Sequence, residues 1–342
     1  MIKIGFIGCG SISHTHVTRL SFLPEGEAEI IGLCDVNLEN AKRISRLVKR
    51  FSNISPKHPS EPHIFRDPLK MLDSLDLDAV IVCTPHVLHY THVMASLERG
   101  LHVLVEKPMA VNLKEAIEMR DKAESKGLIL AVGYQRHFQP EYLFARETIK
   151  SGKLGEPHFV LAWLTQDLRR AIGSRSWYLN PSLSGGGQLI CSGTHLTDIV
   201  LWVIDSEPKR VKAFMDREGA EVEMYVSLSV LFANGALASI SILGDAPEKA
   251  LKEEMKVWCS KGAVYVKDGK VWIHEKGGYL SEVPRELLPR TSPNPDVNFV
   301  RAILGKEKCL VPASCGVNAA KLEQMAYEDA KPIPSNLKPA IL

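Results

Sequence analysis

The sequence has few of the features that mark membrane-bound, secreted or nucleic-acid-binding proteins. Its 42 Lys and Arg nearly balance 40 Asp and Glu, and a formal net charge of +2 gives no electrostatic case for nucleic acid or an anionic membrane. We find no apolar run long enough to span a bilayer, and the strand-like start Ile2-Lys3-Ile4-Gly5 leaves no room for a signal peptide. The seven cysteines are an odd number without a Cys-x-x-Cys pair, which is typical of a reduced, cytoplasmic protein.

The length of 342 residues, 45% of them hydrophobic, is sufficient for two domains. Up to residue 133, short apolar runs alternate with segments of helical spacing, which predicts a doubly wound parallel sheet in an α/β domain. From residue 134 onward, longer alternating strands are joined by turn signals such as Asn234-Gly235 and Asp268-Gly269. They predict a second, α+β domain over 134–342 with an open, mostly antiparallel sheet, whose helix over 316–330 could pack back on the first domain.

A glycine-rich segment, Gly8-x-Gly10-x-x-Ser13, lies between the first expected strand and the first expected helix. Gly8 permits a tight turn, and Gly10 lets the backbone approach a pyrophosphate at the helix N-terminus. Ser13 is small enough for close packing of helix on strand. The pattern alone is weak, but inside a βαβ unit it predicts a dinucleotide site to which Ser11 and Ile12 also contribute.

Asp35 ends the second expected strand, where a carboxylate accepts hydrogen bonds from an adenosine ribose and repels a 2′-phosphate. Val36 and Asn37 offer no arginine to bind such a phosphate, and Arg43 lies too far along the next helix. We therefore expect NAD(H) rather than NADP(H). The alternative is an Asp solvated at the start of a loop.

Two further segments follow apolar strands. Thr84-Pro85 ends one of these strands, and the chain then enters a helix whose N-terminus would face the cofactor. The repeat of His86, His89 and His92 at every third residue has no nearby Cys or carboxylate, so we expect no metal site.

Leu101–Val105 reads as a strand buried on both faces, and it ends on Glu106-Lys107-Pro108. The proline favours extended geometry at Lys107, and open α/β sheets bind ligands at the carboxyl ends of their strands. A lysine held there could act as a general acid/base. The alternative is a surface Glu-Lys pair in a turn.

Five segments together resemble the glucose–fructose oxidoreductase / inositol dehydrogenase (Gfo/Idh/MocA) family, in the same order and across both expected domains. Five motifs are far more specific than any one of them. The segments are Gly8-Cys9-Gly10-Ser11-Ile12-Ser13-x-x-His16, Thr84-Pro85-x-x-x-His89, Glu106-Lys107-Pro108, Gly133-Tyr134-Gln135-Arg136 and Gly185-Gly186-Gly187…Gly193-x-His195-x-x-Asp198. Similar proteins combine a Rossmann domain with an open antiparallel sheet, bind NAD(P), and oxidise or reduce one carbon of a sugar, polyol or nucleotide sugar.

The resemblance implies roles for the matching residues. Lys107 would be the acid/base at the reacting hydroxyl or carbonyl, and His195 the second member of a proton relay and a substrate contact. Glu106 would contact the nicotinamide-side ribose. The cofactor groove would be lined by Thr84, Pro85 and His89, and further pocket residues would be Arg136, Trp177, Cys191 and Thr194.

The sequence departs from the family pattern at Cys191. Members with polyol dehydrogenase activity generally have an acid four residues before the histidine, whereas here the segment is Cys191-Ser192-Gly193-Thr194-His195. A thiol cannot accept strong charge-assisted hydrogen bonds from a substrate hydroxyl. Cys191 is either buried filler or a nucleophile, and His195 is either a relay residue or a helix cap.

We expect an NAD-dependent dehydrogenase or reductase acting on a small carbohydrate-like substrate. Two alternatives remain open: an enzyme that keeps NAD bound and uses transient oxidation for glycoside cleavage or epimerisation, and a non-catalytic NAD-binding sensor. Because a broad open sheet leaves an apolar face to be covered, we also expect a homodimer or homotetramer.

Overall fold

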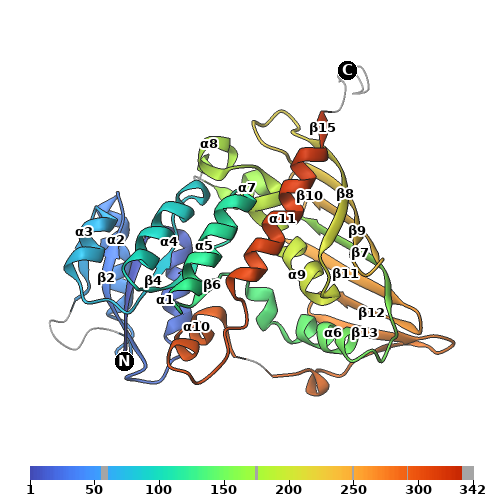
Figure 1. Cartoon of the computed structure of the whole chain (residues 1–342), viewed down its shortest axis with the longest axis horizontal. Helices are drawn as coiled ribbons and strands as arrows, with labels where there is room; N and C mark the ends of the chain where they lie inside the picture. The colour runs from blue at the N-terminus through green and yellow to red at the C-terminus, as the bar shows by residue number, and fades with distance from the viewer. Residues whose placement is uncertain (55–60, 174–175, 249, 291, 333–342) are drawn as a thin grey trace. The chain divides into compact units, whose positions relative to one another are not determined.

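The computed structural model describes residues 1–54, 61–173, 176–248, 250–290 and 292–332 (Figure 1). The chain forms two compact units. The first consists of Met1–Phe138 and Ser292–Val317, and the second of Gln139–Thr291 and Asn318–Leu342. Residues 292–317, which the sequence places beyond the first domain, therefore pack with the first unit.

The first unit is built on a six-stranded parallel sheet of order β3-β2-β1-β4-β5-β6. Its strands are β1 (Ile2–Ile7), β2 (Ala28–Cys34), β3 (His63–Phe65), β4 (Ala79–Val82), β5 (His102–Val105) and β6 (Leu130–Val132). All four residues of β4 are buried, as expected for a strand covered on both faces. The strand order reverses between β1 and β4, so this is the doubly wound sheet that the sequence predicts, with its switch point beside the glycine loop.

Helices cover both faces of this sheet. They are α1 (Ser11–Leu20), α2 (Leu38–Val48), α3 (Pro68–Ser74), α4 (His89–Glu98), α5 (Leu113–Ser125) and α10 (Pro295–Ile303), with short 3-10 turns η1 (His86–Leu88) and η2 (Gln135–Phe138). One core joins α1, α2 and the late helix α10 to β1 and β2, and it includes Phe6, Val17, Ile44 and Phe299, all without exposed surface. Burial of these apolar side chains is the main force that fixes α10 to the first unit.

The second unit holds a nine-stranded sheet of order β14-β13-β12-β11-β7-β10-β9-β8-β15. Its strands are β7 (Pro157–Thr165), β8 (Pro208–Asp216), β9 (Tyr225–Phe232), β10 (Leu237–Leu243), β11 (Lys252–Cys259), β12 (Gly262–Lys267), β13 (Lys270–Glu275), β14 (Leu280–Glu282) and β15 (Lys331–Pro332). Within this second sheet, the β7–β10 and β8–β15 pairs are the only parallel ones among the strands that the structure describes. The predicted mostly antiparallel sheet is confirmed, as are hairpin turns at Gly235 and Gly269, which both have positive φ.

The helices of the second unit are α6 (Pro140–Lys150), α7 (Leu168–Ile172), α8 (Pro181–Ser184), the π-turn η4 (Leu189–Gly193), α9 (Thr194–Ile204) and α11 (Ala313–Asp329), with 3-10 turns η3 (Ser176–Leu179) and η5 (Arg285–Leu287). Helix α11 begins in the first unit and ends in the second. Helices α6 and α9 pack against each other, and α9 packs against β7. Along β7, Val160, Ala162 and Leu164 are buried, whereas Phe159 and Leu161 are 37% and 42% exposed. One face of the sheet is therefore covered and the other is open.

Residues Pro181–Ile204 form a helical run of 24 residues that is long and apolar enough to cross a membrane. The expectation that the chain contains no such run is therefore wrong. However, 89% of its most apolar window is buried inside the protein, as in the core helix of a soluble protein.

Candidate functional site

The glycine loop joins β1 to α1 in a geometry that only glycine allows at its first position. Gly8 has a φ of +91°, and a Cβ there would lie 2.7 Å from the carbonyl carbon of Cys83 at the end of β4. Ser13 is fully buried and donates its hydroxyl hydrogen to the Gly8 carbonyl oxygen at 2.8 Å. The small side chain at the third position thus ties the helix to the loop.

Gly10, the N-cap of α1, has a different environment. A Cβ on Gly10 would meet no atom within 4 Å in the described chain. Packing within the protein therefore does not require glycine there, and the backbone and the first-turn residues Ser11 and Ile12 leave room for an outside group. An exposed helix N-terminus beside a bare backbone is suited to a pyrophosphate.

Asp35 follows β2 and fastens the glycine loop to the turn before α2. Its Oδ2 accepts a hydrogen bond from the Cys9 N–H at 2.8 Å, and its Oδ1 accepts one from the Asn37 N–H at 2.8 Å. Asn40 Nδ2 lies 3.3 Å from the same Oδ1. Asp35 is thus an anchored carboxylate, not one that is merely solvated at the start of a loop.

Arg43 also reaches the loop. Its Nη2 donates to the carbonyl oxygen of Cys9 at 3.3 Å, although the side chain is largely exposed. Arg43 thus comes closer to the loop than its place along α2 suggests, and the expectation that it binds no phosphate stays a prediction.

Thr84 and His89 lie together after β4. His89 Nε2 is 2.9 Å from the Thr84 carbonyl oxygen and Nδ1 is 2.8 Å from the Pro108 carbonyl oxygen. Burial lowers the pKa of the His89 ring, although these two contacts oppose it. Because a neutral ring has one N–H, His89 donates to one of these two carbonyl oxygens and so ties its ring to Thr84 or to Pro108.

The Thr84 hydroxyl oxygen is buried and has no hydrogen-bond partner among the described residues. An unsatisfied buried hydroxyl costs about 1–3 kcal/mol. Together with the open side of Gly10, it fits a site that a bound polar molecule completes.

Glu106 is 8% exposed at the end of β5, which contradicts a surface Glu-Lys pair. Its Oε1 lies 3.2 Å from His16 Nε2, and its Oε2 accepts a hydrogen bond from the Lys107 N–H at 3.2 Å. A Cβ on Gly133 would lie 2.9 Å from Oε1, so Gly133 makes room for the carboxylate. Burial raises the pKa of Glu106, but His16, with smaller contributions from Lys107 and Arg19, outweighs it and brings the pKa to about 2. A fixed negative charge therefore stands beside Lys107, which is only half-buried.

His195 lies in the second unit, on a helix that is continuous from η4 into α9. It is 6% exposed, and Thr194 has no exposed surface. The N-cap residue of α9, Gly193, is itself helical. Because the helix continues from η4 through His195 in this described segment, His195 does not lie at a helix N-terminus and cannot act as a cap. Lys107 and His195 belong to different units, so their pairing stays a prediction.

Glu223, which sequence reasoning missed, fixes the turn that leads to His195. It is 6% exposed, and its carboxylate accepts hydrogen bonds from the N–H groups of Gly187, at 2.8 Å and 2.9 Å, and of Leu189, at 3.1 Å. A Cβ on Gly187 would lie 2.2 Å from the Glu223 carbonyl oxygen, and one on Gly186 would lie 2.3 Å from the Tyr327 hydroxyl oxygen. The triple glycine in the sequence was the signal for this close approach.

Glu323, also missed, lies on α11 against the first turns of α9. Burial raises its pKa to about 8. The Thr197 hydroxyl lies 2.9 Å from Glu323 Oε1 and 3.1 Å from the Thr194 carbonyl oxygen. Because this hydroxyl has one hydrogen for two contacts, the arrangement suits a protonated Glu323 that donates to Thr197.

Cys191 lies in a small apolar cluster with Leu168, Ile172 and Met224 and is 4% exposed. Its sulfur accepts a weak hydrogen bond from the Ser192 hydroxyl at 3.9 Å. These surroundings suit a buried filler residue. Trp177 stacks on Tyr178 with ring centroids 3.8 Å apart in η3.

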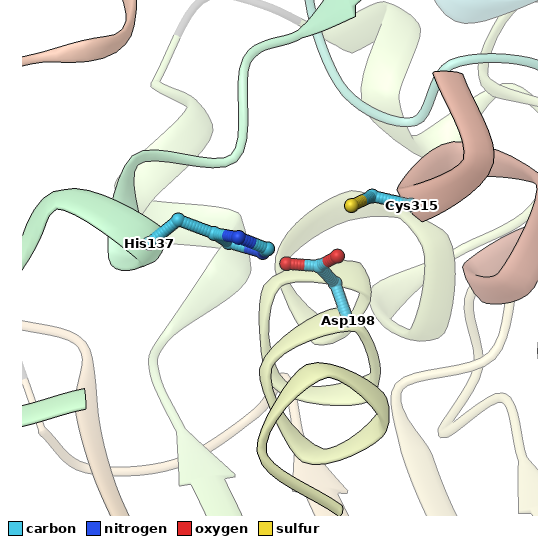
Figure 2. Close-up of side chains that lie close together, drawn as sticks. All are labelled: His137, Asp198 and Cys315. Carbon is cyan, nitrogen blue, oxygen red and sulfur yellow. The ribbon is translucent and has the colours of Figure 1, made fainter. Parts of the chain in front are cut away.

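Arg136 and His137 are buried in η2 of the first unit, at 4% and 1% exposure. Figure 2 shows His137 together with Cys315, which belongs to the first turn of α11 in the same unit. The ligand-type atoms of His137 and Cys315 lie within 4.8 Å of each other. Two protein ligands from one unit are fewer than a zinc site uses, so the expected absence of a metal stays a prediction.

Comparison with known proteins identifies the class. Residues 2–134 match the model of an oxidoreductase family with an NAD-binding Rossmann fold, and residues 142–265 match the GFO/IDH/MocA C-terminal domain. The first unit is thus an NAD-binding Rossmann domain of an oxidoreductase. The chain belongs to the Gfo/Idh/MocA family.

Individual relatives fit this assignment. The chain is 32% identical over 205 residues to D-glucoside 3-dehydrogenase of Escherichia coli, which covers 59% of this chain and 54% of that enzyme. It is 24% identical over 295 residues to inositol 2-dehydrogenase 4 of Saccharopolyspora erythraea, covering 84% and 80%. The crystal structure of the WlbA dehydrogenase from Bordetella pertussis, in complex with NADH and UDP-GlcNAcA, has the same fold, with a TM-score of 0.79, 20% identity and coverage of 96% of both chains. The match thus spans about half the length of the Escherichia coli relative.

Proposed function

We propose that this protein is an NAD-dependent oxidoreductase that transfers a hydride between nicotinamide and a hydroxyl or carbonyl carbon of a sugar, polyol or sugar derivative. The observation that carries the proposal is the buried Glu106 carboxyl group beside Lys107 at the carboxyl end of β5, in the same unit as the open Gly10 loop. Open α/β sheets bind their ligands at this edge. The relatives named as D-glucoside and inositol dehydrogenases support the substrate class.

The residues of the first unit fit NAD. The N-terminus of α1 with Gly10, Ser11 and Ile12 would hold the pyrophosphate, and Asp35 the adenosine ribose. The unpartnered hydroxyl of Thr84, with Pro85 and His89 behind it, would line the groove. When bound, NAD supplies a hydride acceptor and NADH a hydride donor.

In this proposal Lys107 moves the proton. For oxidation, a neutral Lys107 Nζ takes the proton from the substrate hydroxyl; for reduction, the protonated amine returns it to the carbonyl oxygen. His195 would be the second member of the relay, and Glu106 would hold the ribose nearest the reacting ring. Arg136, Trp177, Cys191 and Thr194 would contribute to the substrate pocket.

We propose a cytoplasmic homodimer or homotetramer. The residues exposed on the open face of the second sheet include Leu161, Leu237 and Trp258, at 42%, 48% and 37%. A second copy could cover this apolar face. None of the seven cysteines, all of which the structure describes, forms a disulfide, which suits a reducing compartment.

A screen of sugars and polyols with NAD tests the proposal. Net formation of NADH, followed by its near-ultraviolet absorbance, supports a dehydrogenase. Product without net NADH would instead indicate a mechanism with permanently bound cofactor. Tight NAD binding without turnover of any sugar would indicate a sensor.

A further inference from the structure

His16 lies inside the first unit between two carboxylates. It is on α1 with no exposed surface, and its Nδ1 is 2.6 Å from Oδ1 of Asp296, which is likewise fully buried. Its Nε2 is 3.2 Å from Glu106 Oε1. Asp296 comes from the first turn of α10, 280 positions away in the sequence.

This placement makes the ring an imidazolium. Burial lowers the pKa of His16, but Asp296 and Cys83 together outweigh it, and the pKa stands well above its ordinary value. Arg19 Nη1 lies 3.6 Å from the second carboxylate oxygen of Asp296 and contributes further positive charge. Neutral groups would suit a buried site better, because the cost of removing charges from water often exceeds their attraction.

We propose that Asp296 and His16 are positioning residues that keep Glu106 ionised and fixed in the cofactor site. The inference rests on the proposed function and assigns the late segment 292–317 a part in it. Asp296 holds the proton on Nδ1, so the positive ring faces Glu106. Glu106 is further confined by Gly133 behind Oε1 and by the Lys107 N–H at Oε2.

The charged groups that face Glu106 come from three elements: His16 and Arg19 from α1, Lys107 from its own segment, and the Cys83 thiol after β4. Of these, only His16 contacts both Glu106 and Asp296. Removing the charge of Asp296 therefore acts on Glu106 chiefly through the ring.

The test compares Asp296→Asn, which keeps shape but removes charge, with His16→Gln, whose amide replaces the Nε2 donor without charge. Selective ¹³C labelling of Glu carboxyl carbons in the full chain, with Glu106 assigned through Glu106→Gln, reports the ionisation of Glu106 directly. In the unmodified protein Glu106 should remain ionised at pH 4.5 and above. In both variants a titration of Glu106 should appear in that range, and the Kd for NAD should rise about tenfold.

Glu307→Gln is the matched control, because Glu307 is a carboxylate on the same late segment that binds Arg301 and Asn298 instead. This variant should change neither the titration of Glu106 nor the Kd for NAD. An unchanged Glu106 titration in both variants would overturn the proposal; if Asp296→Asn does not fold, His16→Gln decides. If the Glu106 titration shifts as expected but Glu106→Gln binds NAD normally, then Glu106 does not contact the cofactor. The conclusion that Asp296 and His16 position Glu106 would still hold.

Discussion

Tyr327 donates its hydroxyl hydrogen to Oε1 of Glu223 at 2.7 Å, across 104 positions of sequence. The contact brings α11 onto the glycine turn that precedes His195. Gly187→Ala would push a Cβ into the Glu223 backbone, at 2.2 Å, and should lower the free energy of unfolding by more than about 2 kcal/mol.

Chemical denaturation measures that loss. Gly10→Ala is the contrasting variant, because its Cβ meets nothing within 4 Å. It should leave stability unchanged and weaken NAD binding. Equal stability for both variants would contradict the packing described for Gly187.

Glu323→Gln should flatten the dependence of stability on pH. Since the pKa of Glu323 is raised from 4.5 to about 8, the folded protein binds a proton that the unfolded chain has released between these values. The contribution of Glu323 to stability is therefore fully present below pH 4.5 and is lost as pH rises toward 8, by up to about 1.4 kcal/mol per pH unit. Asp198 and Glu223 are the charged groups that oppose ionisation of Glu323.

Melting temperatures measured between pH 4.5 and 8 give the slope of stability against pH. Glu328→Gln, an exposed position on the same helix, is the control and should retain it. A slope that persists in Glu323→Gln would show that another group is responsible.

Asp35→Ser should relax the preference for NAD. The change removes the carboxylate that would repel a 2′-phosphate, while Arg43 already lies at the loop. Fluorescence titration should show NAD binding weakened and NADP binding strengthened, each about tenfold. The double variant that combines Asp35→Ser with Arg43→Ala should bind NADP no more strongly than the unmodified protein does. If the unmodified protein already prefers NADP, the reading of Asp35 is wrong.

Lys107→Ala should abolish turnover and leave NAD binding intact, because in the proposed mechanism the lysine moves the proton while other residues hold the cofactor. Loss of a general acid/base typically lowers the rate about 10²–10⁴-fold. Lys114→Ala, at a lysine whose side chain is 85% exposed, should have no effect. Residual turnover near the normal rate would exclude Lys107 as the acid/base.

Cys191→Ala should cost about 1 kcal/mol of stability through lost packing in its apolar cluster and should retain turnover. Cys259→Ala, at a half-buried position in β11, should cost less. Complete loss of turnover in Cys191→Ala with normal stability would favour the nucleophile.

Features that depend on the spacing of nearby residues could be predicted from the sequence. The glycine loop, Asp35 and the Lys107 segment each follow an apolar strand, so their place at the sheet edge could be predicted from alternation alone.

Contacts between distant segments could not be predicted in this way. Nothing near His16 in the sequence indicates Asp296, and nothing near Gly187 names Glu223 as its partner. The contact of Arg43 with the Cys9 carbonyl oxygen is another such case, because distance along the sequence is not distance in space. The return of residues 292–317 to the first unit depends on Val297, Phe299 and Val300 finding a core that the sequence assigns to another region.

This return has a consequence for synthesis on the ribosome. The Val132 N–H bonds to the Val311 carbonyl oxygen at 3.0 Å, and α10 closes one face of the first sheet. The N-terminal Rossmann unit therefore cannot be finished when its own strands have emerged. It must wait, with a core partly open, until residues 292–317 have been translated as well.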